Sequence, residues 1–281
     1  MRPIRSMLYI PGSNARALDK ARGLAADAVI FDLEDAVAPD EKVAARRLVA
    51  DMLTEGGYGA RLCVVRINGM ETPWGVDDLA EFAGHAGAMA ILVPKVSGAG
   101  DLDRVAARAA GKPLWAMMET ARGVMRAGEI AGHAALAGMV MGTNDLLRDI
   151  GGRHGADRLA VQAGLGLCLL AARAEGRVIV DGVYNAFRDL AGLRAECEAG
   201  RDMGFDGKTL IHPAQLSVAN EVFAPSPQEV DLARRQIAAH AAALRAGQGV
   251  AVVDGTIVEN LHIVTAEALL AKAGAIAALG V

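Results

Sequence analysis

The chain is poor in aromatic residues and in cysteine, and neither sign of charge dominates. Aromatic residues make up 4% of its 281 residues, and the three cysteines, Cys63, Cys168 and Cys197, are scattered. An odd number of scattered cysteines does not indicate a disulfide framework, so we expect buried free thiols in a reducing cytoplasm. No continuous apolar run reaches the roughly 18 residues that indicate a membrane span, and no signal peptide is expected.

Several common functional signatures are also missing. There is no GxSxG elbow, no Walker loop and no GxGxxG after a strand-like run, which disfavours a covalent serine mechanism, nucleotide hydrolysis and dinucleotide redox chemistry. Zinc is disfavoured because neither HxxxH nor CxxC spacing occurs. The net charge of −4 predicts no general surface for nucleic acid or membrane.

Short, continuous apolar runs alternate with helical patterns along the first four-fifths of the chain. Such runs are typical of parallel strands, which are covered on both faces. Eight strand–helix alternations are the arithmetic of a (β/α)8 TIM barrel, an α/β fold, which we predict over residues 1–224. The predicted strands are residues 5–11, 28–35, 62–68, 90–96, 113–120, 138–146, 178–185 and 206–213.

Residues 225–281 depart from this rhythm and predict a C-terminal helix–hairpin–helix module. Ser226 and Glu229 form a capping-box pattern that opens a helix over residues 228–245. Asp254-Gly255 is a strong two-residue turn signal within a hairpin over residues 250–258, and a final helix runs from about His262. We expect this module to act as a lid or an oligomer contact.

Polar residues stand at or just after nearly every predicted strand end. In a parallel barrel these ends meet at one mouth, where catalytic groups lie. Two carboxylates, Glu119 and Asp145, follow apolar strands and are candidate ligands of Mg²⁺, which binds one or two carboxylates and keeps several waters. The full set is Glu34, Asp35, Arg66, Lys95, Glu119, Asp145, Asn185 and His212.

Arg66 is the candidate clamp for a substrate carboxylate, because a guanidinium group binds carboxylates in a bidentate manner. The alternative, which is compatible with substrate binding, is an ion pair with Glu34, Asp35 or Glu119. Glu34 and Asp35 are expected near the metal, where they would bind its waters rather than the ion.

With these residues in hand, the chain resembles the citrate lyase β-subunit/HpcH-HpaI aldolase superfamily, in its CoA-ester lyase branch. The matching motifs run in order along nearly the whole chain. They are LYIPG at residues 8–12, DLEDAV at 32–37, VRIN at 65–68, VPK at 93–95, METAR at 118–122, GTNDL at 142–146 and LIHP at 210–213.

The resemblance implies an enzyme that uses Mg²⁺, or Mn²⁺, on a 3-hydroxyacyl-CoA with a free carboxylate, such as (3S)-malyl-CoA. It implies Glu119 and Asp145 as metal ligands, with Glu119 also close to the substrate, and Arg66 as the substrate-binding arginine. CoA contacts carry onto Tyr9 and Lys20. A further basic contact of some relatives falls on Asn14. The implied assembly is a homotrimer or a hexamer built as a dimer of trimers.

One departure from the family pattern concerns the reaction. Family lyases carry G-x-M-[IV]-D in the hairpin and offer its aspartate to the adjacent subunit as an acid or base, whereas this chain has Gly255-Thr256-Ile257-Val258-Glu259. The candidate catalytic residues are therefore Arg66, Glu259 and Asp35. Because the motif matches extend into this hairpin, where Glu259 departs from the lyases, we favour hydrolysis of malyl-CoA to (S)-malate and CoA.

Three alternatives stay open at this point. The first is carbon–carbon cleavage of malyl-CoA or citramalyl-CoA, which gives acetyl-CoA and a 2-oxoacid such as glyoxylate. The second is a class II 2-oxoacid aldolase, and the third is a barrel retained only for binding or as a scaffold.

Overall fold

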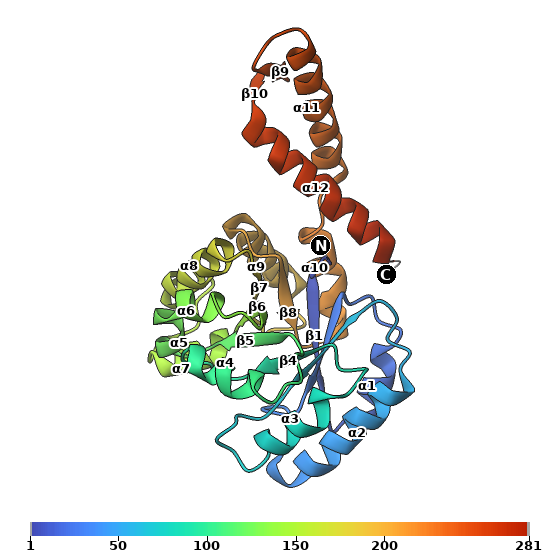
Figure 1. Cartoon of the computed structure of the whole chain (residues 1–281), viewed down its shortest axis with the longest axis vertical. Coiled ribbons are helices and arrows are strands. Elements are labelled where there is room, and N and C mark those ends of the chain that lie inside the picture. The colour runs from blue at the N-terminus through green and yellow to red at the C-terminus, as the bar shows by residue number, and fades with distance from the viewer. Residues whose placement is uncertain (1, 280–281) are drawn as a thin grey trace. The chain divides into compact units, whose positions relative to one another are not determined.

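The computed structural model describes residues 2–279 and divides the chain into two compact units. Ile4–Asn220 form the first unit, while the second contains the chain from Glu221 onward together with Arg2 and Pro3. In Figure 1 the colour of the first unit runs from blue through green and yellow into orange, and that of the second runs from orange to red. The predicted boundary after residue 224 lies close to this division.

The first unit is a closed barrel of eight parallel strands in sequential order, which confirms the predicted fold (Figure 1). Each strand is a short apolar run, and β1 pairs with both β2 and β8 to close the barrel. The strands are β1 Ser6–Pro11, β2 Ala28–Asp32, β3 Leu62–Arg66, β4 Ala90–Val93, β5 Leu114–Met118, β6 Leu136–Met141, β7 Val178–Asp181 and β8 Gly207–Leu210.

Helices surround this barrel and cover the outer faces of its strands (Figure 1). Alternate side chains of the strands fill the interior, where Met7, Ile30, Val64, Trp115 and Val140 form one buried cluster. The helices are α1 Ala15–Ala21, α2 Lys42–Glu55, α3 Gly75–Ala83, α4 Ala99–Ala106, α5 Ala121–Met125, α6 Ala127–Ala131, α7 Thr143–Asp149, α8 Leu159–Ala174, α9 Leu190–Met203 and α10 Leu216–Val222, with 3-10 turns η1 Pro39–Glu41 and η2 Pro213–Gln215.

Every barrel strand after β1 ends earlier than the sequence predicts, and this correction bears on the site. β2 ends at Asp32, so Glu34 and Asp35 lie in the following loop. β6 ends at Met141, and Asp145 belongs to the first turn of α7 rather than to a strand tip. After β2 the chain enters a loop that runs to η1 at Pro39, whereas after β6 helix α7 begins at Thr143.

The second unit consists of α11 Pro227–Arg245, the hairpin β9 Ala251–Val253 and β10 Thr256–Val258, and α12 Asn260–Leu279. The Ser226 capping box is present, and both turn residues of the hairpin, Asp254 and Gly255, have positive φ. The helix–hairpin–helix prediction is therefore confirmed.

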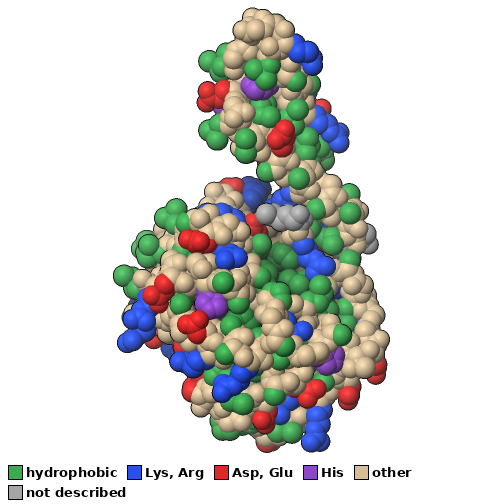
Figure 2. Space-filling model, in the orientation of Figure 1, with side chains coloured by type: hydrophobic (Ala, Val, Ile, Leu, Met, Phe, Trp, Pro, Cys, Tyr) green, Lys and Arg blue, Asp and Glu red, His purple; other side chains and the backbone are tan. Residues whose placement is uncertain are grey.

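Much of the apolar surface of this second unit is exposed, and Figure 2 shows hydrophobic side chains at its surface. α12 is long and apolar enough to cross a membrane by length and composition alone, with a mean hydropathy of 1.4 and only 6% of that window buried. A search for uninterrupted apolar runs missed this property, because Glu267 and Lys272 interrupt the helix. Its exposed apolar residues and those of the hairpin include Val250, Val252, Ile257, Leu261 and Val264.

Candidate active site

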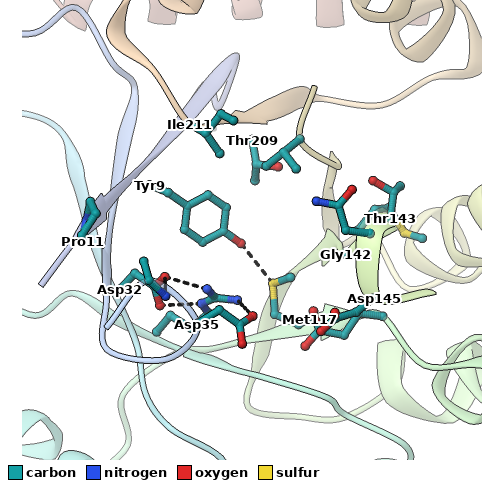
Figure 3. Close-up of a pocket in the computed structure, with 16 residues that line it drawn as sticks. Tyr9, Pro11, Asp32, Asp35, Met117, Gly142, Thr143, Asp145, Thr209 and Ile211 are labelled. Atoms are coloured by element: carbon teal, nitrogen blue, oxygen red, sulfur yellow. Dashed lines mark hydrogen bonds and ion pairs between the residues drawn. The ribbon is translucent and has the colours of Figure 1, made fainter. Parts of the chain in front are cut away.

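A cavity of about 390 Å³ opens at the carboxyl ends of the barrel strands. Residues of β1, β2, β3, β5, β6 and β8 line it, together with residues that follow β2, β5, β6, β7 and β8. Figure 3 shows Tyr9, Asp32, Asp35, Met117 and Asp145 around this common space. The lining combines four carboxylates, those of Asp32, Asp35, Glu119 and Asp145, with the Arg66 guanidinium and with apolar side chains, which suits a small substrate with anionic groups held through a cation.

Arg66, the last residue of β3, is buried at this mouth and surrounded by carboxylates. Its Nε and Nη2 donate to the two oxygens of Asp32 at 2.7 and 2.6 Å, while Nη1 lies 2.9 Å from Glu34 and 3.3 Å from Asp35. The ion-pair alternative for Arg66 is thus present with Glu34 and Asp35. Its role toward substrate stays a prediction.

Asp32 is the functional residue that sequence reasoning passed over. Beyond holding Arg66, its carboxylate accepts hydrogen bonds from the backbone N–H groups of Glu34 at 2.9 Å and Ala36 at 3.2 Å. It therefore fixes the loop that carries two further acids. The signal was available, because Asp32 and Arg66 end adjacent parallel strands and lie directly opposite each other in the strand register.

Tyr9 of β1 lies against the Arg66 guanidinium, whose central carbon is 5.0 Å from the ring centroid. The tyrosine hydroxyl donates to the sulfur of Met117 at 3.3 Å (Figure 3). Burial raises the pKa of Tyr9, although the charge of Arg66 acts in the opposite direction. A neutral Tyr9 lines the cavity, where its predicted contact with substrate can be tested.

Glu119 follows β5 and is only 3% exposed. Burial, followed by the nearby charge of Glu34, raises the pKa of Glu119 to about 7. The backbone N–H of Lys95 donates to its Oε1 at 2.7 Å. A Cβ at Gly142 would lie 2.4 Å from the Cβ of Glu119 and 2.5 Å from its Oε2, so only glycine leaves room for this carboxylate.

Lys95 follows β4 and places its ammonium among the acids of the mouth. It pairs with Glu34, and its Nζ lies 3.8 Å from Asp35 and 3.7 Å from Asp145. Burial lowers the pKa of Lys95, but the hydrogen bond and the charge of Glu34 outweigh burial and raise it. Its φ of +52° is unfavourable for a residue with a Cβ, by about 1–2 kcal/mol.

Asp145 faces the cavity from α7 and is less buried than Glu119. Its side chain is 20% exposed and also lies 3.2 Å from Arg148, one turn along the helix. Within residues 2–279 no cluster of three or more His, Cys, Asp or Glu side chains could hold a metal ion. The pair Glu119 and Asp145 still fits a hard cation such as Mg²⁺, which completes its shell with waters and substrate oxygens.

Two residues of the predicted CoA contact lie outside this cavity. Lys20 is exposed in the last turn of α1 and is absent from the cavity lining. Asn14 caps the same helix by accepting a hydrogen bond from Ala17 N at 3.0 Å. An asparagine where some relatives carry a basic residue thus serves the helix start.

Three other candidates are positioned differently from the cavity acids. Glu259 lies between β10 and α12 in the second unit, where its backbone N–H donates to His262 Nδ1 at 3.2 Å. His212 caps η2 and stacks on Phe187, and it is not part of the lining. Asn185 exchanges two hydrogen bonds with Asn144, which does line the cavity.

The fold and this site together define an α/β barrel with an acidic mouth that is suited to a divalent cation and an anionic substrate. The chain belongs to the HpcH/HpaI aldolase/citrate lyase family, whose model matches residues 5–213. That match covers all eight strands of the barrel.

Relatives of known name cover almost the full chain. A (3S)-malyl-CoA thioesterase of Cereibacter sphaeroides strain KD131 is 70% identical over 276 residues, which span 98% of this chain and 96% of that protein. The citrate lyase subunit beta of Escherichia coli K12 is 36% identical over 282 residues, at 96% and 93% coverage.

A solved structure is similar over the same length. The CitE protein of Mycobacterium tuberculosis, in complex with magnesium, acetoacetate and coenzyme A, superposes with a TM-score of 0.81 at 33% identity. The similarity covers 97% of this chain and 98% of that one.

Proposed function

We propose that this chain is a Mg²⁺-dependent thioesterase that hydrolyses (3S)-malyl-CoA to (S)-malate and CoA. The observation that carries the proposal is the 70% identity to a (3S)-malyl-CoA thioesterase over 98% of the chain. The acidic cavity supports it, since the substrate has one carboxylate and one hydroxyl beside the thioester. Mn²⁺ is the second candidate metal.

Glu119 and Asp145 would hold the ion, and the ion would supply positive charge to the substrate oxygens. Magnesium in the related CitE structure supports this assignment. Arg66 would offset negative charge on the substrate, although Asp32 occupies two of its donors. Tyr9 and Glu119 would line the acyl group, and Lys20 would contact the CoA portion.

In the hydrolysis, a water oxygen bonds to the thioester carbon, the carbon–sulfur bond breaks, and the CoA sulfur leaves and takes up a proton. Asp35 is the candidate base in the barrel, because its side chain is 58% exposed and still lies 3.3 Å from Arg66. Glu259 is the candidate acid or base from the second unit, in its own subunit or a neighbouring one. Asp35 and Glu259 therefore define two variants for kinetic tests.

The alternative reaction is carbon–carbon cleavage to acetyl-CoA and glyoxylate, which the 36% identity to citrate lyase subunit beta keeps in view. A product assay on (3S)-malyl-CoA with Mg²⁺ separates the two reactions. Free thiol and trapped glyoxylate are followed in one cuvette without added enzymes. Thiol release that matches substrate loss supports hydrolysis, whereas glyoxylate without thiol would establish the lyase and overturn the proposal.

We further propose that the protein assembles as a homotrimer or as a hexamer formed by two trimers. The exposed apolar residues of α12 and the hairpin support an oligomer contact, because monomers rarely expose so many apolar side chains on one element. Sedimentation equilibrium of the purified chain tests this, and a monomer at micromolar concentration would contradict it.

The proposed compartment is the cytoplasm. Cys63, Cys168 and Cys197 are buried, and no disulfide joins them among the described residues. Burial raises the pKa of Cys168 and Cys197 to about 12. Buried thiols outside disulfides are compatible with a reducing compartment.

A further inference from the structure

One side chain contacts most of the acids at the barrel mouth. The Lys95 ammonium pairs with Glu34 and lies within 4 Å of both Asp35 and Asp145, while the Lys95 backbone N–H holds Glu119. Both proposed metal ligands are therefore connected to one residue. Ammonium and amide act separately, because the first can swing on its four-carbon stem and the second is fixed by the backbone.

The mouth contains more acids than cations. Five carboxylates gather there, namely Asp32, Glu34, Asp35, Glu119 and Asp145, against the buried Arg66 and the half-buried Lys95. A further buried cation, Lys42, donates to the backbone carbonyls of Leu33 and Glu34 in the loop after β2. Asp32 engages Arg66 through both of its oxygens. Asp145 has two cationic neighbours, Arg148 at 3.2 Å, whose side chain is 73% exposed, and the less exposed Lys95 ammonium at 3.7 Å.

A divalent ion at Asp145 would compete with this ammonium. A Mg²⁺ ion binds carboxylate oxygens at about 2.0–2.1 Å, so an ammonium 3.7 Å from the same carboxylate would face a double positive charge at short range. Like charges at this range repel strongly in a partly buried site. Withdrawal of Lys95 toward Glu34 relieves the repulsion, because the ion pair with Glu34 is already formed.

We propose that the Lys95 ammonium neutralises Asp145 in the metal-free site and competes with the divalent ion for this carboxylate. Binding of the ion displaces the ammonium from Asp145, and this competition lowers the metal affinity. Lys95 is a positioning residue in this scheme, because it acts through Asp145 and Glu119 rather than on the substrate. With its backbone in the left-handed region, Lys95 donates its amide to Glu119 while its ammonium pairs with Glu34. The inference rests on the metal site of the proposed function and adds a competitor to it.

Mg²⁺ binding to the dialysed, metal-free chain, followed by isothermal titration calorimetry, tests this directly. Lys95→Met keeps the length of the stem and removes the charge, so Mg²⁺ should bind roughly tenfold more tightly than to the unmodified chain. Lys95→Arg keeps the charge and should restore an affinity close to the original. Arg108→Met removes an exposed cation from the barrel surface after α4 and should leave the affinity unchanged.

Thermal unfolding with and without Mg²⁺ gives a second readout that does not depend on turnover. Lys95→Met should lower the Tm of the metal-free protein. Because Mg²⁺ should bind this variant more tightly, saturating Mg²⁺ should raise the Tm of Lys95→Met by more degrees than it raises the Tm of the unmodified chain, as binding linkage requires. Lys95→Gln is the replacement if the methionine variant does not fold.

The outcomes separate this inference from the proposed function. If the unmodified chain binds no divalent ion, the proposed metal site fails. If it binds Mg²⁺ but Lys95→Met and Lys95→Gln bind with equal or lower affinity, the site stands and the competition by Lys95 is refuted.

Discussion

Two clusters of buried charges lie within the same barrel, and they differ in balance. At the mouth, five carboxylates face Arg66 and Lys95. Beside β7 and β8, two acids face two cations: Lys208 lies 2.8 Å from Asp181 and 2.6 Å from Glu196, and Arg158 lies 2.5 Å from Asp181. Side chains of Asp181 and Lys208 have no exposed surface.

The difference appears in the acidity of the carboxyl groups. Burial acts to raise the pKa of Asp181, but Lys208 and Arg158 outweigh burial and lower it. Burial and Glu34 raise the pKa of Glu119 to about 7. A balanced cluster stabilises its carboxylates and holds the fold, whereas an excess of acids leaves capacity for an added cation and indicates a functional site.

The largest effect on turnover is expected from removal of the Glu119 carboxylate at the mouth. Glu119→Ala should reduce Mg²⁺-dependent turnover by at least about 100-fold, because the buried carboxylate that we propose as a metal ligand is lost, while the fold is retained. Turnover, calorimetric Mg²⁺ binding and thermal unfolding are measured together. Glu129→Ala, which removes a half-exposed glutamate from α6, is the matched control. Full turnover of EDTA-treated Glu119→Ala protein would eliminate the metal mechanism.

The balanced cluster should respond in stability rather than in metal binding. Lys208→Met leaves Glu196 and Asp181 short of one buried cation and should cost about 3–5 kcal/mol in the free energy of unfolding. Urea denaturation measures this, and Mg²⁺ affinity of the folded variant should be unchanged. A variant as stable as the unmodified chain, or one with altered Mg²⁺ affinity, would remove the distinction between the two clusters.

The acidity of Glu119 predicts how the mouth responds to pH. Protons compete with the metal for a carboxylate with a pKa of about 7, so Mg²⁺ should bind about tenfold more weakly at pH 6 than at pH 8. Between the ordinary value of 4.5 and about 7, folded Glu119 retains a proton that the unfolded chain has released. The stability of the metal-free protein should therefore fall as pH rises through this window.

Calorimetry at both pH values and urea denaturation without metal measure these two slopes. In Glu119→Gln the free energy of unfolding should depend less steeply on pH. Part of the dependence should remain, because burial also raises the pKa of Glu34. A Mg²⁺ affinity independent of pH would show that Glu119 is already ionised or does not bind the ion.

The two clusters also differ in how far the sequence could predict them. The position of the mouth could be predicted from the sequence, because parallel strands bring their carboxyl ends together and polar residues follow the apolar runs. The ion pairs within the mouth could not be predicted, since the pairing of Asp32 with Arg66 depends on strand register and the φ of Lys95 depends on tertiary contacts. Nothing local predicts that Arg158, Asp181 and Lys208 meet, because they are separated by 23 and 27 residues.

Placement of Glu259 marks another limit of sequence reasoning. The hairpin turn at Asp254-Gly255 is a local signal and was predicted correctly, since both positions require positive φ. The proposed role of Glu259 would require a contact with a barrel mouth, and no local sequence pattern predicts such a contact. Its function stays a prediction that Glu259→Gln kinetics can test.

The smallest effect is expected at a cation outside both clusters. Lys20 is exposed on α1, where water and salt screen its charge, so Lys20→Met should raise the KM for (3S)-malyl-CoA by only about three- to tenfold and leave kcat unchanged.

Steady-state kinetics with malyl-pantetheine, which lacks the nucleotide, is the internal control, because loss of a contact with a CoA phosphate should leave the KM for that substrate unchanged. An equal change with both substrates would place the effect on the acyl site, and no change with malyl-CoA would remove Lys20 from the CoA contact. Mg²⁺ affinity and stability should be unaltered in either case, since an exposed cation contributes neither to the acid excess at the mouth nor to the balance beside β7 and β8.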